Sequence, residues 1–123
     1  MGQVHLAGHS VLVVEDEPLI ALHIAECFRA AGASVFTAHN LQDGLRLAGH
    51  PDLSVAIVDF GLSDGDGTGL CERLKGRGIP FVLHTGYTHV SEACRSGVVI
   101  PKPASPAELV SAVARLLKLT LVS

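Results

Sequence analysis

The sequence is poor in aromatic and charged residues. It contains no tryptophan, one tyrosine and four phenylalanines, and 17% of its 123 residues are charged against 48% that are hydrophobic. The core must therefore be built from valine, leucine, isoleucine and alanine. This composition suits an α/β protein whose strands are covered on both faces. A chain of this length is expected to form one compact domain.

Strong charge of one sign, long apolar runs and paired cysteines are also lacking. The net charge of −3 gives no electrostatic footprint for nucleic acid or an anionic membrane. No apolar run approaches the roughly 18 residues of a membrane span, and the N-terminus lacks the basic start of a signal peptide. Cys27, Cys71 and Cys94 are widely spaced and form no C-x-x-C pair. We therefore expect reduced thiols that act as small packing residues in a cytoplasmic protein.

Apolar, β-branched runs recur along the chain with room for a helix between them. They cover residues 11–14, 34–38, 54–58, 80–84 and 97–100. Start signals (Pro18, Asn40 and the Ser105-Pro106 pair) predict helices over residues 18–31, 41–48 and 106–116, and glycines stop the first two. A weaker helix is expected around residues 70–74. The segment between the last two runs leaves room only for a short or distorted helix. Strands that alternate with helices in this way predict a parallel sheet.

Polar side chains follow four of these predicted strands. They are Glu15 and Asp16 after the first, Asp59 after the third, Thr85 after the fourth and Lys102 after the fifth. Open α/β sheets bind ligands beyond the carboxyl ends of their strands, so we expect these side chains to meet at one edge. Each residue alone has an ordinary structural explanation, and only their joint placement indicates a functional site.

The expected cluster has a clear chemistry. Carboxylates about 4 Å apart repel by about 4 kcal/mol per pair at an effective dielectric constant of about 20, which predicts a bound cation. An all-oxygen site suits Mg²⁺. Asp59 could then attack phosphorus to form an aspartyl phosphate, while Lys102 neutralises charge and Thr85 donates to a phosphoryl oxygen.

The stretch from residue 56, AIVDFGLSDGDGTGL, also contains patterns of other families. D-F-G occurs in protein kinases, but the chain is short and has no glycine-rich loop. A D-G-D-G-T phosphatase nucleophile would be Asp64, which lies beyond the strand end. A calcium loop from Asp64 would place Lys75 where a bidentate glutamate is required. We therefore expect Asp64 and Asp66 to serve loop solvation and a turn or cap before the next helix.

From about Ser10 to Lys118 the sequence resembles the receiver domain of bacterial two-component response regulators. The motifs that carry the resemblance are VLVVEDEP, VDFGLSDGDG, HTG and PKP. The resemblance implies a doubly wound, flavodoxin-like five-stranded sheet in the order 2-1-3-4-5, with a shortened helix four in this chain. It also implies Mg²⁺ held by Asp16, Asp59 and the carbonyl of Gly61, with Glu15 acting through water, and a cis Lys102-Pro103 bond.

Three departures from the family pattern stand out. Ser63 replaces a common proline, and Val99 occupies the place of the usual switch aromatic. The segment after Thr85 is short. We therefore expect a switch made of Thr85 and Tyr87, although a packing role for Tyr87 is equally open. PFVLHTGY resembles the Phe-Ala-Thr-Gly-Tyr motif of an atypical, single-domain receiver subgroup found mainly in alphaproteobacteria.

These observations predict a receiver domain over residues 10–120 after an N-terminal extension of residues 1–9. It would take a phosphoryl group from a histidine kinase or phosphotransfer protein onto Asp59 and signal to a downstream protein target. It would catalyse its own phosphorylation and dephosphorylation without being a conventional enzyme. We expect no nucleic-acid or membrane partner, and a homodimer is left open.

Two alternatives stay open. The chain could be a receiver excised from a larger hybrid kinase or transcription factor, or a pseudo-receiver that binds partners without phosphorylation. No residues follow Ser123, which leads us to expect a stand-alone receiver.

Overall fold

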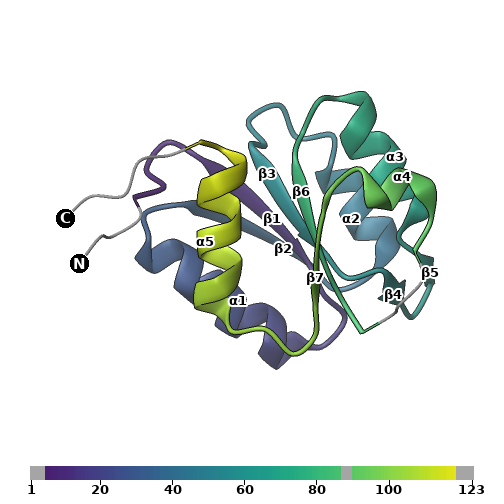
Figure 1. The fold of residues 1–123 in the computed structure, drawn as a ribbon, viewed down its shortest axis with the longest axis horizontal. Coiled ribbons are helices and arrows are strands. Elements are labelled where there is room, and N and C mark those ends of the chain that lie inside the picture. Colours follow the sequence, from purple (N-terminus) through teal and green to yellow (C-terminus); the bar gives the residue numbers. More distant parts are fainter. Residues whose placement is uncertain (1–4, 87–89, 119–123) are drawn as a thin grey trace.

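A five-stranded parallel sheet forms the centre of the fold (Figure 1). The structure is a computed structural model and describes residues 5–86 and 90–118. The strands of the sheet are β1 (Ser10–Val14), β2 (Ser34–Ala38), β3 (Val55–Val58), β6 (Phe81–Thr85) and β7 (Val98–Pro101). They lie in the order β2-β1-β3-β6-β7, and every neighbouring pair is parallel. The predicted doubly wound order 2-1-3-4-5 is confirmed.

Helices cover both faces of this sheet. They are α1 (Pro18–Ala30), α2 (Leu41–Leu47), α3 (Thr68–Gly76), α4 (Glu92–Arg95) and α5 (Pro106–Leu116). In Figure 1, α1 and α5 lie on one side of the strands, and α2, α3 and α4 lie on the other. Among the residues with described placement, no helix combines the length and apolar character that crossing a membrane requires.

The alternation of side chains along β1 explains the two layers. Val11 and Val13 belong to a cluster with residues of α1 and α5, whereas Leu12 and Val14 belong to a cluster with residues of α2, α3 and α4. Successive strand residues point to opposite faces, and both faces of β1 are buried. The centre of the sheet is thus packed on both faces, and this packing positions the strand ends.

The helix signals of the sequence are confirmed. Pro18 begins α1, and Asn40 Oδ1 accepts a hydrogen bond from Asp43 N at 2.8 Å. Ser105 Oγ accepts one from Glu108 N at 3.2 Å. The expected short helix is α4, which has four residues.

The expectation of three reduced thiols is wrong for two of them. Cys71 of α3 and Cys94 of α4 form a disulfide, and among the described cysteines Cys27 is free. The two residues are 23 positions apart and belong to no local motif, but the packing of α4 against α3 brings their Cα atoms to 5.2 Å. The spacing of the cysteines in the sequence does not reveal this disulfide, because it depends on the tertiary contact between the two helices.

The N-terminal segment also takes part in the core. Leu6 is fully buried and packs with residues of α1 and α5. Its backbone N–H donates to Ala31 O at 2.7 Å, just past the end of α1. Leu6 lies within residues 1–9, the stretch expected to be an extension, so at least this part of it is bound to the folded domain.

Candidate functional site

The carboxyl ends of four strands bring the predicted polar residues together. They are Glu15 and Asp16 after β1, Asp59 after β3, Thr85 at the end of β6 and Lys102 after β7. Backbone bonds carry the sheet ladder into this edge: Asp59 N donates to Val14 O at 3.0 Å, and Lys102 N donates to Thr85 O at 2.9 Å. The side chains are therefore placed by the sheet itself.

Lys102 lies between two buried carboxylates. Its Nζ is 3.0 Å from Glu15 Oε1 and 3.1 Å from Asp59 Oδ2. Glu15 is 2% exposed and Asp59 8% exposed. The peptide bond between Lys102 and Pro103 is cis, as the family resemblance implied. One ammonium group thus neutralises part of a buried negative cluster.

The electrostatics of the cluster follow from its burial. Burial raises the pKa of Glu15 to about 7, and the neighbouring Asp59 adds to the rise while Lys102 opposes it. For Lys102, burial disfavours the charge, but hydrogen bonds to Glu15 and Asp59 outweigh it, so its pKa is raised. Lys102 therefore stays charged at neutral pH, whereas Glu15 is poised between its two forms.

The same residues fit a divalent cation. One carboxylate oxygen each of Glu15, Asp16 and Asp59 lies within 4.8 Å of the other two. Glu15 Oε2 is buried and has no hydrogen-bond partner among the described residues. Three carboxylates against one ammonium leave an excess of negative charge, and oxygen ligands of this kind suit Mg²⁺. The unmatched Glu15 oxygen could accept a hydrogen bond from a metal-bound water.

A cavity of about 390 Å³ opens onto this cluster. Asp16, Asp59, Thr85 and Lys102 line it together with Glu17, Gly61 and Gly86. Gly61 N donates to Asp59 Oδ1 at 3.2 Å, which orients the carboxylate toward the other side chains. Glu17 was not identified from the sequence, because an acid before the proline of a helix start has an ordinary structural reading.

The loop after Asp59 holds the two other aspartates away from the cluster. It forms a short antiparallel hairpin of β4 (Gly61–Leu62) and β5 (Gly65–Asp66), which the sequence did not predict. Asp66 Oδ1 accepts from Thr68 N at 3.0 Å, as expected for a turn before α3. Asp59 is thus the only aspartate of the loop in the cluster.

Asp64 is exposed, as expected for a loop residue, but it also makes a contact that was not predicted. Its carboxylate accepts hydrogen bonds from Leu41 N at 2.7 Å and Gln42 N at 3.1 Å, at the start of α2. These bonds, led by the one from Leu41, lower the pKa of Asp64. The first backbone N–H groups of a helix have no hydrogen-bond acceptors within the helix. In α2, the Asp64 carboxylate from a distant loop accepts two of these hydrogen bonds. The contact spans more than twenty positions, so local patterns could not predict it.

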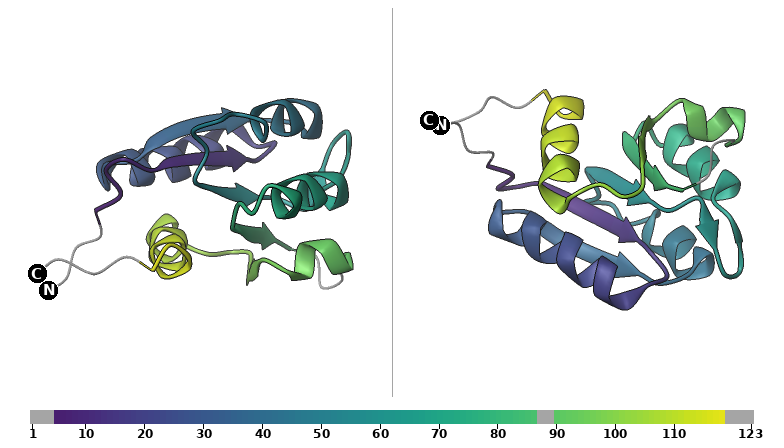
Figure 2. Two further views of the ribbon diagram at one scale, coloured as in Figure 1. Left: turned by 90° about the horizontal axis from the view of Figure 1, so that it is seen from above. Right: turned by 60° about the horizontal axis from the view of Figure 1, so that its bottom comes forward.

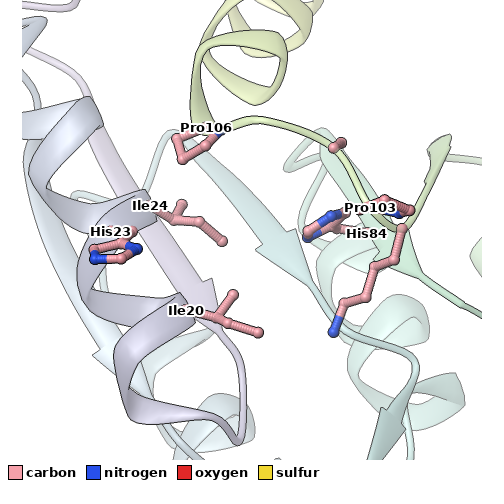
Figure 3. Close-up of a pocket in the computed structure, with 8 residues that line it drawn as sticks. Ile20, His23, Ile24, His84, Pro103 and Pro106 are labelled. Atoms are coloured by element: carbon pink, nitrogen blue, oxygen red, sulfur yellow. The ribbon is translucent and has the colours of Figure 1, made fainter.

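A second cavity, of about 240 Å³, lies beside Lys102 between α1 and the segment that leads into α5 (Figure 3). Ile20 and Ile24 of α1 line one side, His84 and Pro103 line the opposite side, and Pro106 lies above Ile24 at the top of the view. His84 is buried, and burial together with the charge of Lys102 lowers its pKa. Its imidazole is therefore neutral at pH 7.

Of the two expected switch residues, the structure describes Thr85. Thr85 is buried and lies at the cavity of the cluster. Tyr87 lies outside the described residues. Val99, at the place of the usual switch aromatic, is 42% exposed. The role of Tyr87 therefore stays a prediction.

Comparisons with known proteins agree on one family. Residues 11–114 match the family model described as response regulator receiver domain. The chain is 41% identical over 84 residues to the KDP operon transcriptional regulatory protein KdpE of Escherichia coli (strain K12), covering 68% of this chain and 37% of that protein. It is 29% identical over 86 residues to the acid tolerance regulatory protein ActR of Rhizobium meliloti (strain 1021), covering 68% and 44%. The chain thus spans less than half the length of these relatives.

A solved structure shows the same fold. The CheY-like response regulator receiver domain protein from Methanospirillum hungatei JF-1 aligns with a TM-score of 0.80 and 25% sequence identity. The alignment covers 89% of this chain and 94% of that one.

Proposed function

Because the chain belongs to the response regulator receiver family, we propose that it takes a phosphoryl group from a phosphohistidine onto Asp59. The donor would be a histidine kinase or a phosphotransfer protein, and the phosphorylated domain would signal to a downstream protein target. The observation that supports this most is the contact of Lys102 Nζ with both Glu15 and Asp59 at the strand ends.

The residues of the cluster would divide the chemistry as follows. A carboxylate oxygen of Asp59 attacks phosphorus, an O–P bond forms, and the P–N bond to the donor imidazole breaks. The Lys102 ammonium would neutralise charge on the transferring group, and the Thr85 hydroxyl could donate to one of its oxygens. Mg²⁺, held by Asp16, Asp59 and the Gly61 carbonyl with Glu15 acting through water, would supply further charge neutralisation.

Two finer assignments belong to the same proposal. The motif PFVLHTGY, the four-residue α4 and the exposed Val99 support membership of the Phe-Ala-Thr-Gly-Tyr subgroup. A cytoplasmic location is also proposed, and cell fractionation tests it.

Phosphoryl labelling tests the proposal directly. A small phosphodonor such as acetyl phosphate, with Mg²⁺, should label the wild type in a bond that is labile to alkali and hydroxylamine. Asp59→Asn keeps the shape but removes the nucleophile, so labelling should vanish. Asp64→Asn and Asp66→Asn are matched controls from the same loop and should still label. Labelling of Asp59→Asn at the wild-type level would overturn the assignment.

The same assay distinguishes a pseudo-receiver from a phospho-accepting receiver. A pseudo-receiver would label neither with acetyl phosphate nor with a phosphorylated kinase, whereas a receiver that normally forms part of a longer protein would label like a stand-alone one.

A further inference from the structure

We propose that Cys71 and Cys94 are a reversible oxidation site whose state controls residues 90–97, the segment that contains α4. The two cysteines form a disulfide that joins α3 to α4. Both side chains are fully buried. Figure 2 shows α4, in green, beside α3 in both views. The coupling to phosphorylation rests on the function proposed above, whereas the oxidation itself does not.

The disulfide attaches α4 covalently to α3. This helix has four residues, and Cys94 is its one buried residue. Val90 and Ala93 are partly buried and pack against the same cluster as Cys71. A helix this short has little stability of its own and depends on tertiary packing. Reduction would therefore leave α4 held chiefly by one small side chain and two partly buried neighbours.

The bond also ties together the two segments that leave the acceptor site. Thr85 lies within the loop that the disulfide closes, between Cys71 and Cys94. On the other side, Cys94 Sγ is 3.6 Å from Gly67 O, and Gly67 N donates to Phe60 O at 2.9 Å. Phe60 directly follows Asp59. The oxidised pair thus joins α4 to α3 covalently, and the approach of Cys94 Sγ to Gly67 O places this bond beside the end of the loop after Asp59.

The reduced state has a ready local arrangement. A thiol on Cys94 could donate a weak hydrogen bond to the Gly67 carbonyl from its present position. Cys71 would remain a small apolar residue in the cluster that contains Leu70 and Leu74. Neither state leaves a strong polar group unsatisfied, so both are compatible with the same fold.

The chemistry is thiol–disulfide exchange with a low-molecular-weight disulfide. One cysteine thiolate attacks a sulfur of that disulfide, forms a mixed disulfide and releases one small thiolate. The second cysteine thiolate attacks the protein sulfur of the mixed disulfide and releases the other. The two cysteine sulfurs are oxidised, the small disulfide is reduced to two thiols, and the protons lost by the cysteines pass to them. A dithiol reductant reverses the reaction, and access requires local opening of α4.

Thiol counting tests the site independently of phosphorylation. The Cys27→Ser variant is used because glutathione disulfide could itself modify the free Cys27. Equilibrated with glutathione disulfide, freed of it and then denatured, this variant should react with no maleimide and carry no bound glutathione by intact mass, and it should react with two equivalents after dithiothreitol. Two reactive thiols under both conditions, or bound glutathione in place of the intramolecular bond, would overturn the proposal.

Hydrogen exchange tests the structural consequence. Amides of residues 90–97 should exchange at least tenfold faster in reduced than in oxidised wild type, with α5 as the internal control. The double variant Cys71→Ala/Cys94→Ala should behave as the reduced protein under both conditions. If that variant does not fold, the comparison of the two wild-type states decides alone. Equal exchange in the two states would overturn the control of this segment.

Labelling by acetyl phosphate tests the coupling. The oxidised protein should label at least threefold more slowly than the reduced protein, because the bridge restrains residues 90–97 on α3. Equal rates with labelling that depends on Asp59 would refute the coupling alone. Absence of labelling in both states would instead refute the proposed function, while thiol counting and hydrogen exchange would still decide the oxidation site.

Discussion

Replacing Lys102 by methionine should destabilise the protein in the absence of Mg²⁺ and increase its affinity for Mg²⁺. Methionine keeps a long unbranched side chain but removes the charge that lies 3.0 Å from Glu15 and 3.1 Å from Asp59. Both carboxylates are buried. The variant would therefore retain the packing of the site and lose its neutralising cation.

The expected magnitude follows from the burial of the three groups. Removing one partner of a fully buried ion pair costs about 3–5 kcal/mol. The Lys102 side chain is 27% exposed, and Glu15, with a pKa of about 7, can take up a proton to reduce the repulsion. We therefore expect the free energy of unfolding to fall by about 2 kcal/mol at pH 8 and by less at pH 6, where Glu15 is protonated. A loss of about 2 kcal/mol corresponds to a Tm lower by roughly 8 °C in a domain of this size.

The affinity for Mg²⁺ should move in the opposite direction. Lys102 repels a cation bound by the neighbouring carboxylates, and its removal should tighten binding by about tenfold, equivalent to about 1.4 kcal/mol. Saturating Mg²⁺ should therefore narrow the difference in Tm between the variant and the wild type.

Two measurements check these expectations. Circular dichroism follows thermal unfolding in EDTA and in Mg²⁺, and titration calorimetry measures the affinity, since the sequence has no tryptophan to report binding. Lys75→Met is the matched control because Lys75 is exposed at the end of α3 and its loss changes the net charge equally. Identical stability and affinity of the two variants would refute the ion-pair reasoning.

Three further predictions concern other parts of the structure. In EDTA, the folded state binds the Glu15 proton more tightly than the unfolded state. Protonated Glu15 therefore contributes its full stabilisation of the folded state below pH 4.5, its ordinary pKa, and this contribution is lost as the pH rises through about 7. Glu15→Gln should remove that loss, and urea unfolding should show the variant to be more stable than the wild type by about 1–3 kcal/mol at pH 8. If the free energy of unfolding of the variant falls with pH as steeply as that of the wild type, the prediction is wrong. Asp64→Ala should lower Tm at pH 7 without affecting phosphoryl labelling. The pKa of Asp64 is lowered on folding, so its carboxylate contributes stability above pH 3.8, and this stability is lost as the pH falls through the pKa of the folded state. A Tm difference between variant and wild type that persists at pH 2 would argue against a contribution from the charge. Leu6→Ala should lower the free energy of unfolding by about 2–4 kcal/mol in urea. The control Leu19→Ala replaces a side chain that is 71% exposed and should leave the free energy of unfolding almost unchanged. Equal effects of the two substitutions would contradict the packing of the N-terminal segment.

Local sequence patterns were enough to predict the parallel sheet and the meeting of the polar side chains at its edge. Apolar β-branched runs separated by capped helices dictate parallel strands, and parallel strands bring their carboxyl ends to one edge. Asp59 and Lys102 were therefore recognisable as neighbours although they are 43 positions apart. The strand order itself came from the resemblance to a family, since periodicity alone does not specify which strands pair.

Contacts between surfaces that no local pattern encodes were decided by the tertiary structure. The disulfide of Cys71 and Cys94 exists because α4 packs on α3, and Asp64 binds the start of α2 because the hairpin after Asp59 carries it there. The pKa of Glu15 depends on burial and on side chains from other strands, which only the assembled edge provides. The sequence by itself determined which chemical groups stand at the strand ends, because that depends on periodicity along the chain. Only the tertiary structure decided which distant groups touch and how strongly they are buried, because distances and desolvation arise when separate elements pack together.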